Sequence, residues 1–284
     1  MNEGLWRKMN STNYKGFEND SLIISVEEAS KLLGNRNVIF IDTRNYWKYT
    51  KGHIPGAYDL ELFGFHWVDT SEKGVEAFVK QMQMLLRSLG IDKRKQVIFY
   101  QNNSGYDAAR GVWLLNYMGH RKAKLLDGGL NLWKRSNLPV STRDPPAAKQ
   151  SKFVAKPDRT LIASLHSLSS GIKNGSFQII DSRYSAEYSG KYHRALRAGH
   201  VPNSINIEWS CALRKDGTLK NAQYLRRLYS KLDKRSETVT YCQSGYRAAH
   251  SWFVLKLLGY EKVRNYLGSW YEWGNNPETQ IVQK

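Results

Sequence analysis

The chain of 284 residues carries the same short signals twice, and the second copy follows the first by about 140 residues. Such self-similarity is typical of duplicated domains, and this length suits two domains of ordinary size. The repeated signals are Ile41-Asp42-Thr43-Arg44 with Ile180-Asp181-Ser182-Arg183, Gly52-His53-Ile54-Pro55 with Gly199-His200-Val201-Pro202, Ser104-Gly105-Tyr106 with Ser244-Gly245-Tyr246, and Gly128 and Trp133 with Gly268 and Trp273. The sequence therefore predicts two homologous domains, the second with about eight extra residues within 182–198.

A polar segment that is rich in proline separates the two copies. Residues 141–152 contain Pro145-Pro146 and show no apolar periodicity, which is typical of an extended linker. We therefore place the first domain at residues 1–140 and the second domain at residues 153–284.

Each copy predicts strands that alternate with helices. Residues 38–41, 96–100, 178–180 and 238–241 are short apolar or β-branched runs, as in the buried strands of a parallel sheet. A helical spacing of apolar residues follows each Ser-Gly-Tyr signal and ends at a glycine. The predicted fold class is α/β, with each domain an open, mostly parallel sheet that carries helices on both faces.

The formal net charge of +18 raises the question of nucleic-acid binding. The basic residues are spread along the chain, and the densest cluster, Asp92-Lys93-Arg94-Lys95, is typical of a solvated turn. We therefore expect no nucleic-acid partner, although a positive field would gather a small anionic substrate. No apolar run is long enough to cross a bilayer, and the first twenty residues contain no apolar secretion signal. We expect a cytoplasmic protein without a membrane partner.

The two cysteines, Cys211 and Cys242, are too few for a disulfide framework and lack the paired spacing of a zinc site. We expect Cys211 to be a packed thiol, because free cysteines are among the most buried residues. Cys242 differs, because it directly follows an apolar strand and opens a helix. Reactive groups lie at that place in α/β sheets, so we predict that Cys242 is a catalytic nucleophile.

The loop after Cys242 contains groups that favour the thiolate form. Gln243-Ser244-Gly245-Tyr246 is short enough for its backbone N–H groups to form an anion-binding nest at a helix N-terminus. Arg247 adds a positive charge. Four residues separate Cys242 from Arg247, one fewer than in cysteine phosphatases, and Ala248 occupies the place of the phosphatase arginine. The loop therefore suits a single sulfur atom, and a phosphatase is the weaker alternative.

Together these signals resemble the two-domain rhodanese family, the thiosulfate and 3-mercaptopyruvate sulfurtransferases. The resemblance extends from about Ile23 to Val282. It rests on Gly52-His53-Ile54-Pro55-Gly56-Ala57, Gly199-His200-Val201-Pro202 and Gly268-Ser269-Trp270-Tyr271-Glu272-Trp273-Gly274-Asn275. It implies a catalytic cysteine in the second domain and a first domain that has lost its own.

The loop of the first copy fits that implication. Gln101-Asn102-Asn103-Ser104-Gly105-Tyr106 contains no thiol, and Asp107 stands where Arg247 stands in the second copy. An aspartate there would repel an anion. We expect the first domain to pack against the second and to wall the active-site cleft, without persulfide chemistry of its own.

Basic residues before the second His-Pro signal are candidates for holding the anionic end of a substrate. The resemblance implies this role for Arg194, and Arg183 is a second candidate. Glu187 stands where relatives often have a further arginine. A solvated basic loop is the alternative interpretation for both arginines.

The resemblance implies that Cys242 carries the sulfane sulfur of thiosulfate as a persulfide and passes it to a nucleophilic acceptor. That acceptor would be cyanide in a test tube, and a thiol or thioredoxin-like protein in the cell. The charge of Arg247 favours thiosulfate over 3-mercaptopyruvate as the donor. No metal or organic cofactor is implied. A non-enzymatic module that relays persulfide to a partner is the alternative from another class, because its motif would be identical.

Overall fold

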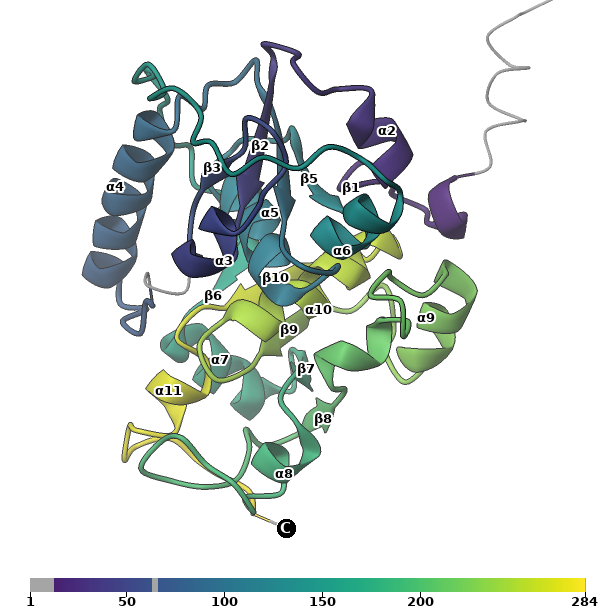
Figure 1. Ribbon diagram of the computed structural model, residues 1–284. Coiled ribbons are helices and arrows are strands. Elements are labelled where there is room, and N and C mark those ends of the chain that lie inside the picture. Colours follow the sequence, from purple (N-terminus) through teal and green to yellow (C-terminus); the bar gives the residue numbers. More distant parts are fainter. Residues whose placement is uncertain (1–12, 63–65, 284) are drawn as a thin grey trace, which may run out of the picture.

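The computed structural model describes residues 13–62 and 66–283, which form two domains that each contain one five-stranded sheet (Figure 1). The strand order is β1-β5-β4-β2-β3 in the first sheet and β6-β10-β9-β7-β8 in the second, and every neighbouring pair is parallel. The sequence repeat is therefore a repeat of topology. The predicted α/β fold class is confirmed, and the expectation about a secretion signal falls largely on residues outside the described ranges.

The first domain lies above the second in Figure 1 and runs in purple to teal. Its strands are β1 (Ile23–Ile24), β2 (Val38–Asp42), β3 (Tyr58–Asp59), β4 (Gln96–Tyr100) and β5 (Ala123–Leu126). Its helices are the 3₁₀ turn η1 (Tyr14–Gly16), α2 (Val26–Ser30), α3 (Tyr46–Thr50), α4 (Glu72–Ser88), α5 (Tyr106–Tyr117) and α6 (Gly129–Arg135).

The second domain repeats this order. Its strands are β6 (Ile162–Ala163), β7 (Gln178–Asp181), β8 (Ser204–Asn206), β9 (Thr238–Tyr241) and β10 (Val263–Tyr266). Its helices are η3 (Arg159–Leu161), α7 (Leu165–Asn174), α8 (Ser185–Tyr188), η4 (Trp209–Ala212), α9 (Ala222–Leu228), α10 (Tyr246–Leu257) and α11 (Ser269–Trp273).

Alternating strand residues supply the apolar surface for both faces of each sheet, as the period of a strand requires. In β2, Ile39 and Ile41 belong to one apolar cluster, and Phe40 between them belongs to another. In β7, Ile180 and Ile179 divide in the same way. Helices cover both faces of each sheet for this reason.

The two domains share one of these apolar clusters. It contains Trp113 of α5 and Trp252 of α10, and these two helices pack against each other. The other two clusters lie on the outer faces of the sheets, beneath α2 and α6 in the first domain and beneath α7 and α11 in the second. Because the shared core is continuous, the domain interface fixes the two loops that precede α5 and α10 relative to each other.

The chain between the two sheets runs along the first domain. Residues 142–158 form no helix or strand. The Ser151 N–H donates to the Arg87 carbonyl of α4 at 3.0 Å, and the Lys156 N–H donates to the Met118 carbonyl after α5 at 3.0 Å. In the described residues, no helix is both long enough and apolar enough to cross a membrane.

Candidate active site

Cys242 lies at the carboxyl end of β9, between the ends of β7 and β10. The chain leaves β7 towards β8 on one side and leaves β9 towards β10 on the other, so the strand order reverses at this point. Open parallel sheets bind ligands outside such a reversal, because the two loops diverge there. The Cys242 side chain is 1% exposed, so the thiol lies within the protein and not on its surface.

Hydrogen bonds from α11 and β10 fix the carbonyl groups of Cys242 and of the loop that follows it. The carbonyls of Cys242 and Gln243 each accept a 2.9 Å hydrogen bond from a backbone N–H in the first turn of α11. Asn265 of β10 donates its side-chain amide to the Gly245 carbonyl at 3.0 Å. The loop therefore turns its oxygen atoms away from the side on which an anion would bind.

The N–H groups of the same loop are left available. No described residue accepts a hydrogen bond from the backbone N–H of Gln243, Ser244 or Gly245. They precede α10, a helix whose positive dipole end faces the loop. Consecutive N–H donors at a helix N-terminus form a binding site for an anion, as the sequence predicts.

Two residues with left-handed backbone set the shape of the loop. Gly245 has a φ of 80°, and a Cβ atom there would lie 2.8 Å from the Leu267 carbonyl oxygen, which excludes a side chain. Ser269 has a φ of 52°. Its hydroxyl accepts a hydrogen bond from the Cys242 N–H at 3.1 Å and donates to the Tyr266 carbonyl at 2.8 Å. Ser269 thus fixes the backbone that carries the thiol.

Arg247 closes the far end of the loop through a carboxylate. Its Nη1 and Nη2 donate to the two oxygens of Glu187 at 2.5 and 2.9 Å. Glu187, on α8, is 1% exposed, and it also accepts from Arg194 Nη2 at 3.2 Å. Burial disfavours the Glu187 carboxylate, but the hydrogen bonds and charges of the two arginines outweigh it and lower the pKa of Glu187. The Glu187 carboxylate therefore neutralises most of the positive charge of Arg247.

Arg194 lies at the edge of the same loop. Its backbone carbonyl accepts a hydrogen bond from Gln243 Nε2 at 3.1 Å, and its side chain is 46% exposed. Arg194 belongs to the segment that is longer in the second domain than in the first.

Arg183 has a different environment from the one expected of a substrate-binding residue. It is 1% exposed, and its guanidinium donates to Asp181 at 2.6 Å and to the Gly199 carbonyl at 2.8 Å. In the first domain, Arg44 makes the same pair with Asp42 at 2.6 Å. A pair that recurs in a domain without a thiol belongs to the fold. We therefore assign Arg183 to bracing the segment after β7 and not to contact with a substrate.

In the first domain, one loop N–H group has an acceptor where its counterpart at Ser244 has none. The Ser104 N–H donates to the Gly217 carbonyl at 2.9 Å, and the Asp107 N–H donates to Gln101 Oε1 at 3.0 Å. Burial and the nearby Glu61 raise the pKa of Asp107 to about 7. The first copy therefore lacks the thiol, and its Ser104 N–H is not available to bind an anion.

Cys211 contradicts the expectation of a packed thiol. It lies on the 3₁₀ turn η4, and it is exposed. Burial of part of the side chain and the nearby Glu208 raise the pKa of the Cys211 thiol. A raised pKa leaves less thiolate at neutral pH, so Cys211 is accessible but poorly activated.

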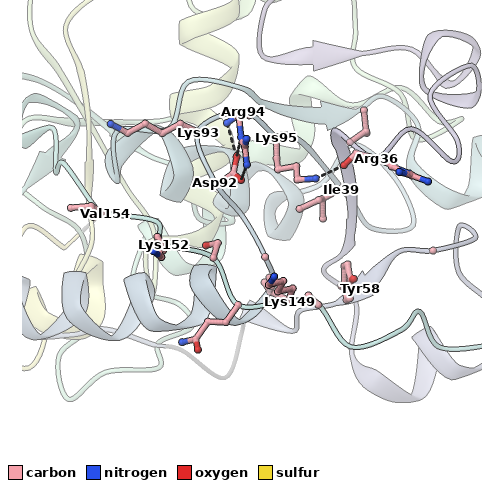
Figure 2. Close-up of a pocket in the computed structure, with 17 residues that line it drawn as sticks. Arg36, Ile39, Tyr58, Asp92, Lys93, Arg94, Lys95, Lys149, Lys152 and Val154 are labelled. Carbon is pink, nitrogen blue, oxygen red and sulfur yellow. Dashed lines mark hydrogen bonds and ion pairs between the residues drawn. The ribbon is translucent and has the colours of Figure 1, made fainter.

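A pocket lined by basic residues lies away from the thiol loop. It has a volume of 890 Å³ and lies between the start of β2, the turn before β4 and the linker (Figure 2). Its lining includes Arg36, Lys93, Arg94, Lys95, Lys149 and Lys152. Arg94 is paired with Asp92 at 3.0 Å, and Lys95 donates to the Arg36 carbonyl. No residue of the pocket belongs to the second sheet or to residues 242–247.

Two contributors to the thiol loop, Ser269 and Glu187, could not be predicted from the sequence. Ser269 was visible only as part of the Gly268-Ser269-Trp270 signal, and nothing in that signal indicates that its hydroxyl binds the Cys242 N–H. The pairing of Glu187 with Arg247 has one sign in the sequence, which is a glutamate within a basic segment.

The fold and the loop define a protein of two tandem α/β domains, in which one copy of a strand-to-helix loop carries a thiol and the other does not. Residues 25–136 and 164–276 each match the model of the Rhodanese-like domain. The chain therefore belongs to the rhodanese family, with one domain of the family in each half.

Known proteins resemble most of the chain. A putative thiosulfate sulfurtransferase from Mycobacterium leprae is 35% identical over 269 residues, which cover 89% of this chain and 95% of that protein. The sulfur carrier protein TtuD from Thermus thermophilus is 33% identical over 277 residues, which cover 92% and 96%. The solved structure of an anaerobic ergothioneine biosynthesis enzyme from Chlorobium limicola has a TM-score of 0.82 at 21% identity, covering 94% of this chain and 71% of that one, and supports the fold alone.

Proposed function

We propose that this protein is a sulfurtransferase that moves the sulfane sulfur of thiosulfate to a nucleophilic acceptor through a persulfide on Cys242. The observation that carries the proposal is the set of backbone N–H groups at Gln243, Ser244 and Gly245 beside a buried thiol. These donors stabilise negative charge on sulfur both before and after the transfer. The sulfurtransferase name of the Mycobacterium leprae relative supports the same activity.

The reaction proceeds in two displacement steps. The Cys242 thiolate attacks the outer sulfur of thiosulfate, an S–S bond forms, and sulfite leaves with the electron pair of the bond that breaks. The terminal sulfur of the persulfide then carries the negative charge. An acceptor thiolate or cyanide attacks that sulfur, and the Cys242 thiolate is the leaving group. No external oxidant or reductant is consumed, and ping-pong kinetics are expected.

The cellular acceptor is proposed to be a thiol or a thioredoxin-like protein, with cyanide as the acceptor in a test tube. A cytoplasmic location is proposed with it, because a reducing compartment keeps both cysteines as thiols. The name of the Thermus thermophilus relative supports a second candidate, a carrier that passes persulfide to a partner protein without turning over free donor. Turnover of thiosulfate and cyanide by the purified protein separates the two.

The choice of donor provides the first prediction. We expect kcat/KM for thiosulfate to exceed that for 3-mercaptopyruvate by about tenfold or more, a difference of about 1.4 kcal/mol in transition-state stabilisation. The physical reason is charge: thiosulfate is a dianion, and the Glu187 carboxylate lies between two guanidinium groups, which leaves the cluster with a net positive charge. The measurement is a side-by-side steady-state assay with cyanide as the common acceptor.

Two controls make the donor comparison decisive. Arg194→Gln removes the exposed cation of the cluster, and it should raise KM for thiosulfate more than for the monoanionic 3-mercaptopyruvate. Arg214→Gln, at an exposed ion pair with Asp216, should change neither. A higher kcat/KM for 3-mercaptopyruvate would reverse the donor assignment and leave the sulfurtransferase activity in place.

A further inference from the structure

Arg110 of the first domain is a buried cation at the interface between the domains. It lies on α5, and it is 3% exposed. Its guanidinium carbon lies 4.3 Å from the centre of the Trp113 ring and 5.3 Å from the centre of the Tyr246 ring. Tyr246 is the last loop residue before Arg247, and its hydroxyl donates to the Leu62 carbonyl of the first domain. Arg110 therefore reaches the thiol loop from the opposite domain.

Arg110 is the exception among the buried arginines that the structure describes. Arg44, Arg183 and Arg247 each pair with a carboxylate. Arg110 makes no hydrogen bond or ion pair with any described residue, its Nη1 is a buried donor without a partner among them, and its guanidinium packs against aromatic rings instead. A charge that is removed from water and left unpaired destabilises the fold. Proteins keep such groups at functional sites, where activity outweighs the loss of stability.

The repeat explains how Arg110 comes to face this loop. Position 110 of the first copy corresponds to position 250 of the second, because the loops of the two domains are offset by 140 residues. His250 of α10 reaches across the interface, and its Nε2 lies 2.9 Å from the Ser104 carbonyl oxygen in the loop of the first domain. Each helix thus presents one side chain to the loop of the other domain, and Arg110 is the one presented to the thiol loop.

Because Arg110 has no carboxylate partner among the described residues, we look for its counter-ion in the thiol loop, at Cys242. Glu187 already matches the charge of Arg247, so that guanidinium is not available as a full counter-ion for sulfur. We propose that Arg110 is the counter-ion of the sulfur anion on Cys242, the thiolate before transfer and the persulfide after it. Only the persulfide part of this inference rests on the proposed function. It makes Arg110 a positioning residue that the non-catalytic domain supplies to the site.

The ionisation of the surrounding groups supports this arrangement. Burial lowers the pKa of Arg110 to about 10, and the proximity of Tyr246 and Cys242 acts against that shift. Burial and the charge of Arg110 lower the pKa of His66, which leaves His66 neutral above pH 7. Among the described residues, the groups that interact electrostatically with Cys242 or Arg110 are His66, Tyr106, Tyr246 and Arg247. Asp107 acts on Tyr106 and Tyr246, and Glu187 pairs with both Arg247 and Arg194.

The test measures the reactivity of the thiol without any sulfur donor. The rate of iodoacetamide alkylation at Cys242 is followed between pH 5 and pH 10 by peptide mass spectrometry, in the full chain. We expect the neutral variants Arg110→Met and Arg110→Gln to move the midpoint of this profile up by about one pH unit, a tenfold loss of thiolate. Arg110→Lys should restore most of the wild-type profile. Arg121→Met, at an exposed ion pair with Asp158, is the matched control and should change nothing.

Two further measurements separate this role from a structural one. The melting temperature of Arg110→Met should equal or exceed that of the wild type, because the substitution removes an unpaired buried charge. Because burial raises the pKa of Asp107 to about 7, the profile is repeated in Asp107→Asn, where the effect of Arg110→Met should persist. A folded neutral variant with the wild-type alkylation profile would overturn the proposal. Alkylation needs no thiosulfate. If Arg110→Met shifts the alkylation profile but the wild type transfers no sulfur from thiosulfate, the proposed donor is refuted and the role of Arg110 stands.

Discussion

Replacing Cys242 with serine should abolish sulfur transfer, with a fall in kcat/KM of at least about a thousandfold. A serine hydroxyl at this position still lies at the carboxyl end of β9 and can still accept hydrogen bonds from the loop. It cannot form a bond to sulfane sulfur that an acceptor later cleaves, so no intermediate is made. The measurement is the initial rate of thiocyanate formation from thiosulfate and cyanide.

Cys211→Ser is the matched control, because it removes the other thiol of the chain. Cys211 is exposed and its pKa is raised, so this variant should keep most of the wild-type rate. A Cys211→Ser variant that loses activity to the extent expected for Cys242→Ser, with both proteins folded, would contradict the assignment of the nucleophile.

The second large effect concerns the Glu187 carboxylate. Glu187→Gln leaves the buried Arg247 guanidinium without its counter-charge, and it should lower the free energy of unfolding by about 3–5 kcal/mol at pH 7. The matched control is Glu27→Gln, which removes a carboxylate from the exposed ion pair with Lys31 and should cost less than about 1 kcal/mol. Urea denaturation at pH 7 measures both.

The stability that Glu187→Gln loses relative to the wild type should depend on pH. Because the pKa of Glu187 is lowered in the folded protein, its stabilising effect is present above its ordinary value of 4.5 and is lost as the pH falls through the folded value. The difference between the wild type and Glu187→Gln should therefore be full at pH 7 and shrink at acidic pH. Equal unfolding free energies for Glu187→Gln and Glu27→Gln at pH 7 would refute the account of how the loop is closed.

Features of the fold that depend on neighbouring residues could be predicted from the sequence. The duplication and the strands that end at Asp42 and Asp181 depend on short stretches of chain. The position of Cys242 could be predicted for the same reason, since a strand, a short loop and a helix follow one another directly.

Features that depend on residues distant in sequence could not be predicted. The sequence presents Arg183 and Arg247 alike, as basic residues next to predicted site elements. Arg183 makes a local pair with Asp181, two positions before it, whereas Arg247 pairs with Glu187, sixty positions before it. Arg110 is further removed, because it lies in the other domain and is brought to Tyr246 by the packing of α5 against α10.

The exposure of Cys211 shows a different limit. Free cysteines are usually buried, and that tendency alone predicted a packed thiol. The 3₁₀ turn η4 instead buries its neighbours Trp209 and Ala212 and turns Cys211 outward. Which residue of a short turn faces the core depends on the surface on which the turn packs, and a tendency of residue types contains no information about that surface.

The central claim is that sulfur resides on Cys242 between the two steps, and intact-mass analysis after incubation with thiosulfate tests it most directly. The account predicts that the wild type gains the mass of one sulfur atom, that peptide mapping places it on Cys242, and that cyanide removes it. Cys211→Ser should gain the same adduct, and Cys242→Ser should gain none. An adduct on Cys211 alone, or turnover of thiosulfate by a protein that never carries sulfur on Cys242, would contradict the claim.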